Sequence, residues 1–135
     1  MRPTLLSPAL LRAALLSPAV LSLALLAAAA PAADRRMPAA TPAGKPVSCI
    51  PLSQIRETRV RNDRTIDFVM RGRARVYRNV LPNSCPGLGF EQRFSYATSL
   101  SRLCSVDIIT VLFQSPVQRG ASCGLGPFQP VTLAR

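Results

Sequence analysis

Arginine is the residue type whose number and spacing point most directly to chemistry in this sequence. All but one of its 17 basic residues are arginines, and eight of these fall between residues 56 and 78, where only three acidic residues lie. Guanidinium groups bind phosphate or carboxylate oxygens through paired hydrogen bonds. A GC-rich coding bias also enriches arginine, so a plainly solvated basic face is the competing interpretation. The candidate anion-binding residues are Arg59, Arg61, Arg71, Arg73, Arg75 and Arg78.

Four cysteines, Cys49, Cys85, Cys104 and Cys123, are the second feature that could carry chemistry. An even number of cysteines outside the reducing cytosol predicts two disulfides. Four thiolates can also hold zinc, but structural zinc sites present their ligands in close pairs, and successive cysteines here are 36, 19 and 19 positions apart. We therefore expect disulfides and no metal site. Three connectivities stay open, and the one we favour joins Cys85 to Cys123 and Cys49 to Cys104.

Catalytic groups are scarce in the chain. It contains no histidine, the usual base for serine and cysteine nucleophiles. The remaining candidates for an acid or a base are Tyr77, Glu91, Tyr96 and Asp107, while Asp67 is expected to be a surface carboxylate paired with neighbouring arginines. We predict a non-enzymatic protein without a cofactor. A small enzyme or enzyme inhibitor with an unrecognised cleft is the alternative, and a purely structural protein is another.

The first 32 residues predict export. Two arginines lie in the amino-terminal part, an uncharged apolar run extends over residues 13–33, and Ala30-Pro31-Ala32 supplies the small residues that cleavage requires. We expect a signal helix that is removed near Ala33, leaving no transmembrane segment in a periplasmic or secreted protein. An uncleaved anchor is the alternative, which Pro18 and the cleavage site disfavour. Cleavage removes two arginines and lowers the formal charge from +11 to +9.

The rest of the chain predicts a linker followed by one small β domain. Residues 33–47 are rich in proline and alanine and are expected to be a disordered linker, and residues 48–135 to form the domain. Alternating apolar residues over 64–81, interrupted by turn residues at 71–74, predict a β-hairpin. A strand over 57–61 would precede it and make a three-stranded meander.

Further strands are expected toward the carboxyl end. Residues 93–98 are predicted to form a short aromatic strand after a helical turn at 88–92, and residues 129–133 a final strand. Residues 106–113 are the strongest strand by composition and are expected to lie centrally, buried on both faces. The predicted fold is mainly β, a small antiparallel barrel or sandwich of about five to seven short strands stapled by disulfides.

Five short motifs follow one another along this domain: Cys49-Ile50-Pro51-Leu52, Asn62-Asp63-Arg64-Thr65-Ile66, Tyr77-Arg78-Asn79, Ser84-Cys85-Pro86-Gly87-Leu88 and Cys123-Gly124-Leu125-Gly126-Pro127-Phe128. Their order and spacing resemble an uncharacterised family of small exported cysteine-containing proteobacterial proteins. The resemblance covers about residues 48–133. It implies a location in the cell envelope, and because the family is one of unknown function it supplies no active site to carry over.

Charge and location together predict a binding function. We expect an exported, non-enzymatic envelope protein whose basic β-hairpin contacts anionic envelope lipids or an acidic partner protein. Nucleic acid is not the expected partner, since RNA-binding modules interleave aromatic residues with their basic ones and aromatic residues are sparse around these arginines.

Overall fold

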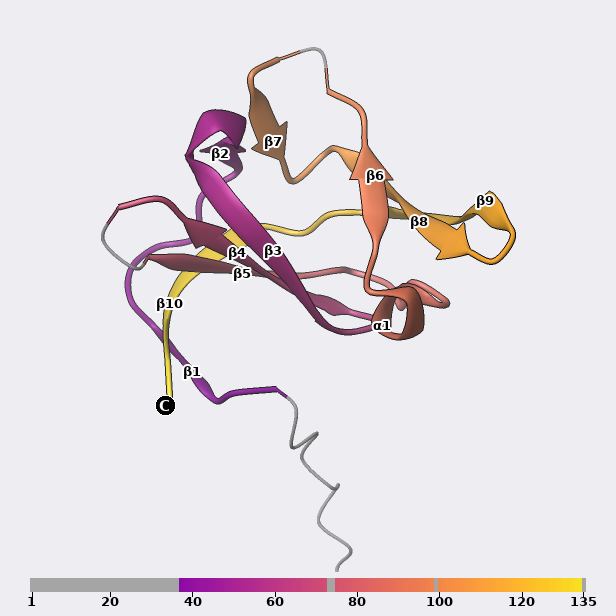
Figure 1. Ribbon diagram of the computed structural model, residues 1–135. Coiled ribbons are helices and arrows are strands. Elements are labelled where there is room, and N and C mark those ends of the chain that lie inside the picture. The colour runs from indigo at the N-terminus through magenta and orange to yellow at the C-terminus, as the bar shows by residue number, and fades with distance from the viewer. Residues whose placement is uncertain (1–36, 73–74, 99, 135) are drawn as a thin grey trace, which may run out of the picture. The chain divides into compact units, whose positions relative to one another are not determined.

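The computed structural model describes residues 37–72, 75–98 and 100–134. The predicted signal segment and the first four residues of the predicted linker lie outside the described residues, as does Arg73. The described chain is built from ten short strands in antiparallel sheets, with one α-helical turn and one 3-10 turn (Figure 1). The predicted mainly β, antiparallel class is confirmed, with more strands than expected. In this part of the chain the sheets do not close into a barrel.

The largest sheet has five strands in the order β1-β10-β5-β4-β3. Alternation in β4 turns Ile66, Phe68 and Met70 toward the core, as predicted, and β4 pairs with β3 on one side and with β5 on the other. The predicted hairpin and three-stranded meander are therefore confirmed. The strand bounds are β1 Ala40–Pro42, β3 Ile55–Asn62, β4 Thr65–Met70, β5 Val76–Val80 and β10 Phe128–Leu133.

Two smaller sheets complete the fold. The order of the three-stranded sheet is β6-β8-β9, and β2 pairs with β7. The helical turn α1 leads into β6, and the 3-10 turn η1 leads into β3 (Figure 1). The bounds of these elements are β2 Cys49–Pro51, η1 Leu52–Gln54, α1 Leu88–Glu91, β6 Phe94–Tyr96, β7 Arg102–Cys104, β8 Ile108–Gln114 and β9 Val117–Gly124.

One hydrophobic core is shared by all three sheets. Phe68 of β4 is completely buried and meets Phe128 of β10 edge to face, with ring centroids 5.4 Å apart. Phe94 of β6 packs against Phe68 from the other sheet at 6.5 Å. Such aromatic pairs add about 0.5–1.5 kcal/mol to the effect of burial. The same core also contains Ile50 of β2, Leu103 of β7, and Ile109 and Val111 of β8.

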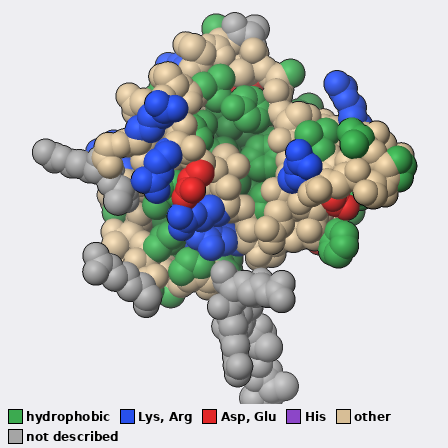
Figure 2. Space-filling model, in the orientation of Figure 1, with side chains coloured by type: hydrophobic (Ala, Val, Ile, Leu, Met, Phe, Trp, Pro, Cys, Tyr) green, Lys and Arg blue, Asp and Glu red, His purple; other side chains and the backbone are tan. Residues whose placement is uncertain are grey.

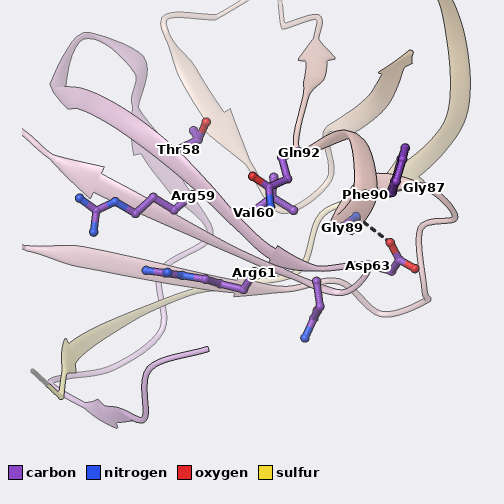
Figure 3. A pocket seen from close by; sticks show the side chains of 10 residues that line it. Thr58, Arg59, Val60, Arg61, Asp63, Gly87, Gly89, Phe90 and Gln92 are labelled. Carbon is purple, nitrogen blue, oxygen red and sulfur yellow. Dashed lines mark hydrogen bonds between the residues drawn. The ribbon is translucent and has the colours of Figure 1, made fainter. Parts of the chain in front are cut away.

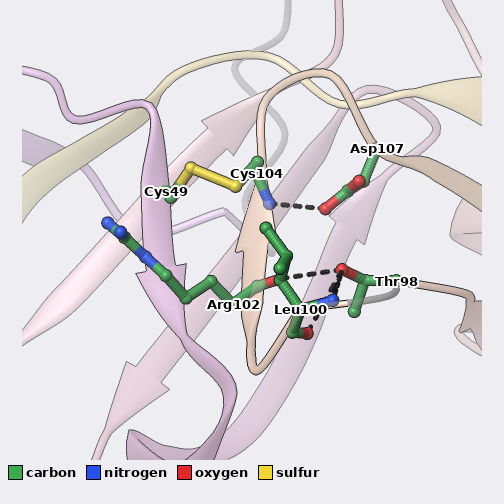
Figure 4. The surroundings of a disulfide bond; sticks show 6 residues. All are labelled: Cys49, Thr98, Leu100, Arg102, Cys104 and Asp107. Carbon is green, nitrogen blue, oxygen red and sulfur yellow. Dashed lines mark hydrogen bonds between the residues drawn. A yellow bond between two sulfur atoms is a disulfide. The ribbon is translucent and has the colours of Figure 1, made fainter.

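Both disulfides have the favoured pairing. Cys49 and Cys104 face each other across the β2–β7 pair (Figure 4). The second bond ties the fully buried Cys85 to Cys123 of β9. All four sulfurs are consumed, so no thiolate remains for zinc. Two disulfides indicate an oxidising, non-cytoplasmic environment, and in the chain-entropy model each is worth about 4 kcal/mol for loops of 55 and 38 residues.

Two other expectations differ from the structure. Residues 40–42 of the predicted linker form β1, which pairs with β10, and Val47 bridges to Phe128. Main-chain pairing needs no bulky side chain, so composition did not reveal it. The strand predicted over 106–113 does lie centrally in its sheet, but it begins at Ile108 and is not buried on both faces. Val106 is 85% exposed and Ile108 57% exposed, because only one face of that sheet meets the core.

Residues from several of the short sequence motifs connect distant segments of the chain through hydrogen bonds. The side chain of Asn79 is fully buried and exchanges two hydrogen bonds with the backbone of Gly126, at 2.5 and 2.9 Å. A Cβ atom on Gly126 would lie 2.2 Å from the carbonyl oxygen of Val80, so only glycine fits there. Likewise Asp63 Oδ1 accepts the N–H of Gly89 at 2.7 Å and fixes α1 against the end of β3.

No helix within the described residues is long and apolar enough to cross a bilayer.

Candidate anion-binding surface

Two of the six candidate arginines surround a buried carboxylate. Asp67 on β4 has a completely buried side chain and lies between Arg61 of β3 and Arg78 of β5. Arg61 Nε donates to Oδ2 at 2.8 Å, while Arg78 donates to Oδ1 at 2.7 Å and to Oδ2 at 2.9 Å. Arg78 also donates to the Pro38 carbonyl at 3.2 Å, which holds the segment before β1. The ion pairing predicted for Asp67 is confirmed, but its predicted surface position is wrong.

The charges around Asp67 determine its ionisation. Burial raises the pKa of its carboxyl, but the hydrogen bonds from Arg78 and Arg61, together with their positive charges, outweigh burial and hold the pKa below its usual value of 3.8. Asp67 is therefore ionised at neutral pH and accepts hydrogen bonds from both arginines. Arg61 and Arg78 have structural partners and are poorly placed to bind an external anion.

A third candidate, Arg59, is paired at the surface. Glu57 lies between Arg59 and Arg56 on the outer face of β3, and Arg56 Nη2 is 3.7 Å from its Oε1 atom. All three side chains are about half exposed, so this pairing adds little stability. One carboxylate serves two guanidinium groups here, which leaves the surface of β3 with an excess of positive charge.

The two remaining described candidates lie at the tip of the β4–β5 hairpin. Arg71 and Arg75 line a hollow of about 230 Å³ together with Gln54 and Tyr77. The Arg71 N–H donates to the Gln54 carbonyl at 2.7 Å, which ties the tip to η1, and Arg75 Nη1 is 3.5 Å from the Tyr77 hydroxyl. Among the described residues lining this hollow there is no carboxylate. Both guanidinium groups can therefore donate to an anion that enters it.

A second concave surface runs along β3. A hollow of about 730 Å³ lies between β3 and α1 and is lined by Thr58, Val60 and Gln92, among others, while Arg59 and Arg61 point away from α1 (Figure 3). It adjoins a hollow of about 370 Å³ between β3 and β6, lined by Phe94 and other residues. The sequence carries no signal for this groove, because its existence depends on which strands lie at the edges of the two sheets.

The surface view shows how these features are distributed. Basic side chains follow one another over the five-stranded sheet, with an acidic side chain among them, and apolar side chains form the floor of the hollow between this sheet and the β6-β8-β9 sheet (Figure 2). Basic and concave surfaces are therefore neighbours on this face.

The four acid or base candidates are not gathered into one site. Tyr77 lines the hollow at the hairpin tip, and Tyr96 lines the one between β3 and β6. Asp107 accepts the Cys104 N–H at 2.7 Å, and neither it nor Glu91 lines these hollows. No hydrogen bond joins any two of these four described side chains, and no one of the three hollows is lined by two of them.

Comparisons with known proteins provide no relative: no family model, no curated protein and no solved structure matches the chain.

Proposed function

We propose that this protein is an exported, non-enzymatic envelope domain that binds an anionic group of a partner at the tip of its β4–β5 hairpin. The observation that carries the proposal is the hollow at the tip, which Arg71 and Arg75 both line without a carboxylate among the described lining residues. The contrast with Arg61 and Arg78, which share Asp67, supports it. Two disulfides and the amino-terminal apolar run support export.

The chemistry of the tip suits phosphate or carboxylate oxygens. Each guanidinium group presents donors in a planar fork that matches two such oxygens. The hydroxyl of Tyr77 and the side-chain amide of Gln54 line the same hollow and can donate further hydrogen bonds. With the leader removed, the net charge of +9 steers anionic partners toward the domain over longer distances.

Phosphate occurs on lipid headgroups and carboxylate on acidic proteins, so the test has two arms. In one arm the purified, oxidised protein is titrated with vesicles of phosphatidylglycerol, and in the other with a soluble polyglutamate peptide, each at several salt concentrations. The double variant Arg71→Gln, Arg75→Gln should weaken binding by about tenfold or more in the arm that reflects the natural partner. Binding by the parent must also weaken as salt screens the charges.

The matched control removes two arginines elsewhere. Arg102→Gln with Arg119→Gln lowers the net charge by the same amount but changes β7 and β9 instead of the tip. If both double variants lose binding equally, only net charge matters and the proposed site is wrong. Binding that is absent in both arms, or insensitive to salt, overturns the proposal as a whole.

Export has its own test. Mass spectrometry of the protein isolated from the envelope fraction of cells should find an amino terminus near Ala33 and both disulfides formed. An intact leader on protein from the cytosolic fraction would contradict this part of the proposal.

A further inference from the structure

The edge strand β3 presents unpaired backbone groups to the groove. In an antiparallel pair, successive residues point their N–H and C=O groups alternately toward the partner strand and away from it. Met70 N–H donates to the Arg75 carbonyl at 2.9 Å, so the backbone groups of Met70 point toward β5. Asp67 lies three residues earlier, so by alternation its backbone groups point toward β3. Arg59 lies opposite Asp67. The backbone groups of its neighbours Thr58 and Val60 therefore point away from β4.

The facing edge, β6, has the same property. Arg93 accepts the N–H of Leu112 of β8 at 3.1 Å, so by alternation Ser95 also bonds to β8. The backbone groups of Phe94 and Tyr96 then point away from β8. Among the described residues, no other element forms a backbone hydrogen bond with Thr58, Val60, Phe94 or Tyr96.

Concave space lies between these two edges. Thr58, Phe94 and Tyr96 line the same hollow of about 370 Å³, and the larger hollow continues it along β3 toward α1. Its floor is apolar, because Val60 and Phe94 pack against the hydrophobic core. An open edge with main-chain donors and acceptors beside an apolar floor is the kind of site to which an extended peptide adds as a further strand.

The charges along the groove select the occupant. Arg59 and Arg93 line the two hollows together with Arg61, which is already paired with Asp67, and the carboxylates that line them are Glu57 and Asp63. Both carboxylates are occupied, Asp63 by the N–H of Gly89 and Glu57 by two arginines. We propose that the groove receives an extended acidic segment of a partner protein, which pairs with the outward backbone groups of Thr58 and Val60 as an additional strand beside β3.

A second copy of this chain fits the edge less well. Antiparallel pairing of β3 with itself would bring together two edges that each carry Arg56, Arg59 and Arg61 against one glutamate. None of the three hollows described above is lined by residues of β9, the other long edge strand. In the partner segment, apolar residues would alternate with acidic ones, the former over Val60 and Phe94 and the latter beside Arg59.

The test uses a defined probe and the oxidised, isotopically labelled protein. The probe is a synthetic peptide of alternating valine and glutamate, matched to the 8 residues of β3. Binding should slow amide hydrogen exchange at Thr58 and Val60 by about tenfold or more and leave Glu57 and Arg59 unchanged, because their N–H groups already bond to β4. A peptide with lysine in place of glutamate should not bind.

Two proline variants locate the edge that is used. Thr58→Pro removes an N–H that points into the groove and spares the pairing with β4, so binding should fall by about tenfold or more. Ser122 lies opposite Thr110, whose backbone bonds to β6, so Ser122→Pro makes the same change at the edge strand β9. It should leave binding within about twofold of the parent. If Thr58→Pro fails to fold, amide exchange in the parent protein decides the question alone.

Three outcomes overturn the proposal. One is no binding of the glutamate peptide at about 1 mM, and another is binding without slower exchange at Thr58 and Val60. The third is slow exchange at these amides in the protein alone at high concentration, which would identify a second copy as the occupant. Because the groove is separate from the hairpin tip, the double variant Arg71→Gln, Arg75→Gln should keep the exchange effect, so the two proposals can fail independently.

Discussion

The arginines around Asp67 and those at the hairpin tip come from the same three-stranded meander, yet their surroundings are opposite. Arg61 and Arg78 hold a carboxylate that is 0% exposed and are themselves only 15% and 11% exposed. Arg71 and Arg75 line an open hollow without a carboxylate among its described lining residues. The difference teaches that a count of arginines does not locate a binding site. What separates structural from available guanidinium groups is whether the fold places an acidic residue within reach.

Removal of the shared carboxylate should have the largest effect on stability. Asp67→Ala leaves Arg61 and Arg78 largely buried without a counter-charge, so the free energy of unfolding should fall by about 3–5 kcal/mol. At the tip, Arg71→Gln should change it by no more than about 0.5 kcal/mol. Urea denaturation of both variants measures the difference. Equal effects of the two substitutions would show that water or a rearrangement compensates the charges beside Asp67.

The two arginines at Asp67 should themselves differ. Arg78 donates two hydrogen bonds to the carboxylate and one to the Pro38 carbonyl, whereas Arg61 donates one to the carboxylate. Hydrogen bonds to charged groups contribute about 1.5–3 kcal/mol each to stability. Arg78→Gln should therefore cost about 3 kcal/mol and Arg61→Gln about 1.5 kcal/mol, again by urea denaturation. A larger loss for Arg61→Gln would contradict this ranking.

Lowering the pH should reduce the stability that the Asp67 cluster contributes and leave the contribution of the hairpin tip unchanged. The pKa of Asp67 in the folded protein lies below its usual value of 3.8, so its ionised form contributes stability above that pH. This contribution is lost as the pH falls from about 3.8 through the lower folded value. The gap in unfolding free energy between the parent and Asp67→Asn should therefore narrow below about pH 3.8. A gap that stays constant across this range would refute the assigned pKa direction.

The tip variant serves as the control for this titration. No carboxylate is present among the described residues lining its hollow, so Arg71→Gln with Arg75→Gln should give a stability curve parallel to that of the parent over the same pH range. A change in slope would mean that an acidic group outside the described residues pairs with the tip.

Local sequence patterns predict where the strands lie better than they predict which side chains those strands bury. The hairpin was predictable because Ile66, Phe68 and Met70 alternate before turn residues, and the disulfide pairing was the one favoured. The depth of Asp67 was not predictable, since it depends on two arginines from neighbouring strands closing over it. Burial of β8 was overestimated because β-branched composition does not tell whether one or both faces of a sheet are covered.

The candidate site was predicted only in part, for a similar physical reason. The sequence placed six arginines together, and the structure separates the five described ones by their partners. The groove had no sequence signal at all. Thr58 and Val60 belong to an ordinary alternating strand, and their backbone groups stay open only because β3 lies at the edge of its sheet. Edge position is a property of the assembled topology.

A carboxylate introduced at the tip should occupy its two arginines as Asp67 occupies Arg61 and Arg78. Gln54 lines the hollow with Arg71 and Arg75, so Gln54→Glu supplies an acceptor for both guanidinium groups without removing either. Because the site is exposed, stability should change by no more than about 0.5 kcal/mol. Affinity for the anionic probe of the tip should nevertheless fall by about tenfold, as in the double arginine variant.

A matched charge change distinguishes local pairing from general electrostatics. Gln118→Glu adds the same negative charge on β9, far along the chain from the tip, and should weaken anion binding by no more than about twofold. A similar loss in both glutamate variants would mean that net charge governs binding. A loss confined to Gln54→Glu would mean that Arg71 and Arg75 bind anions because the fold leaves them without a partner, while Arg61 and Arg78 do not because Asp67 already occupies them.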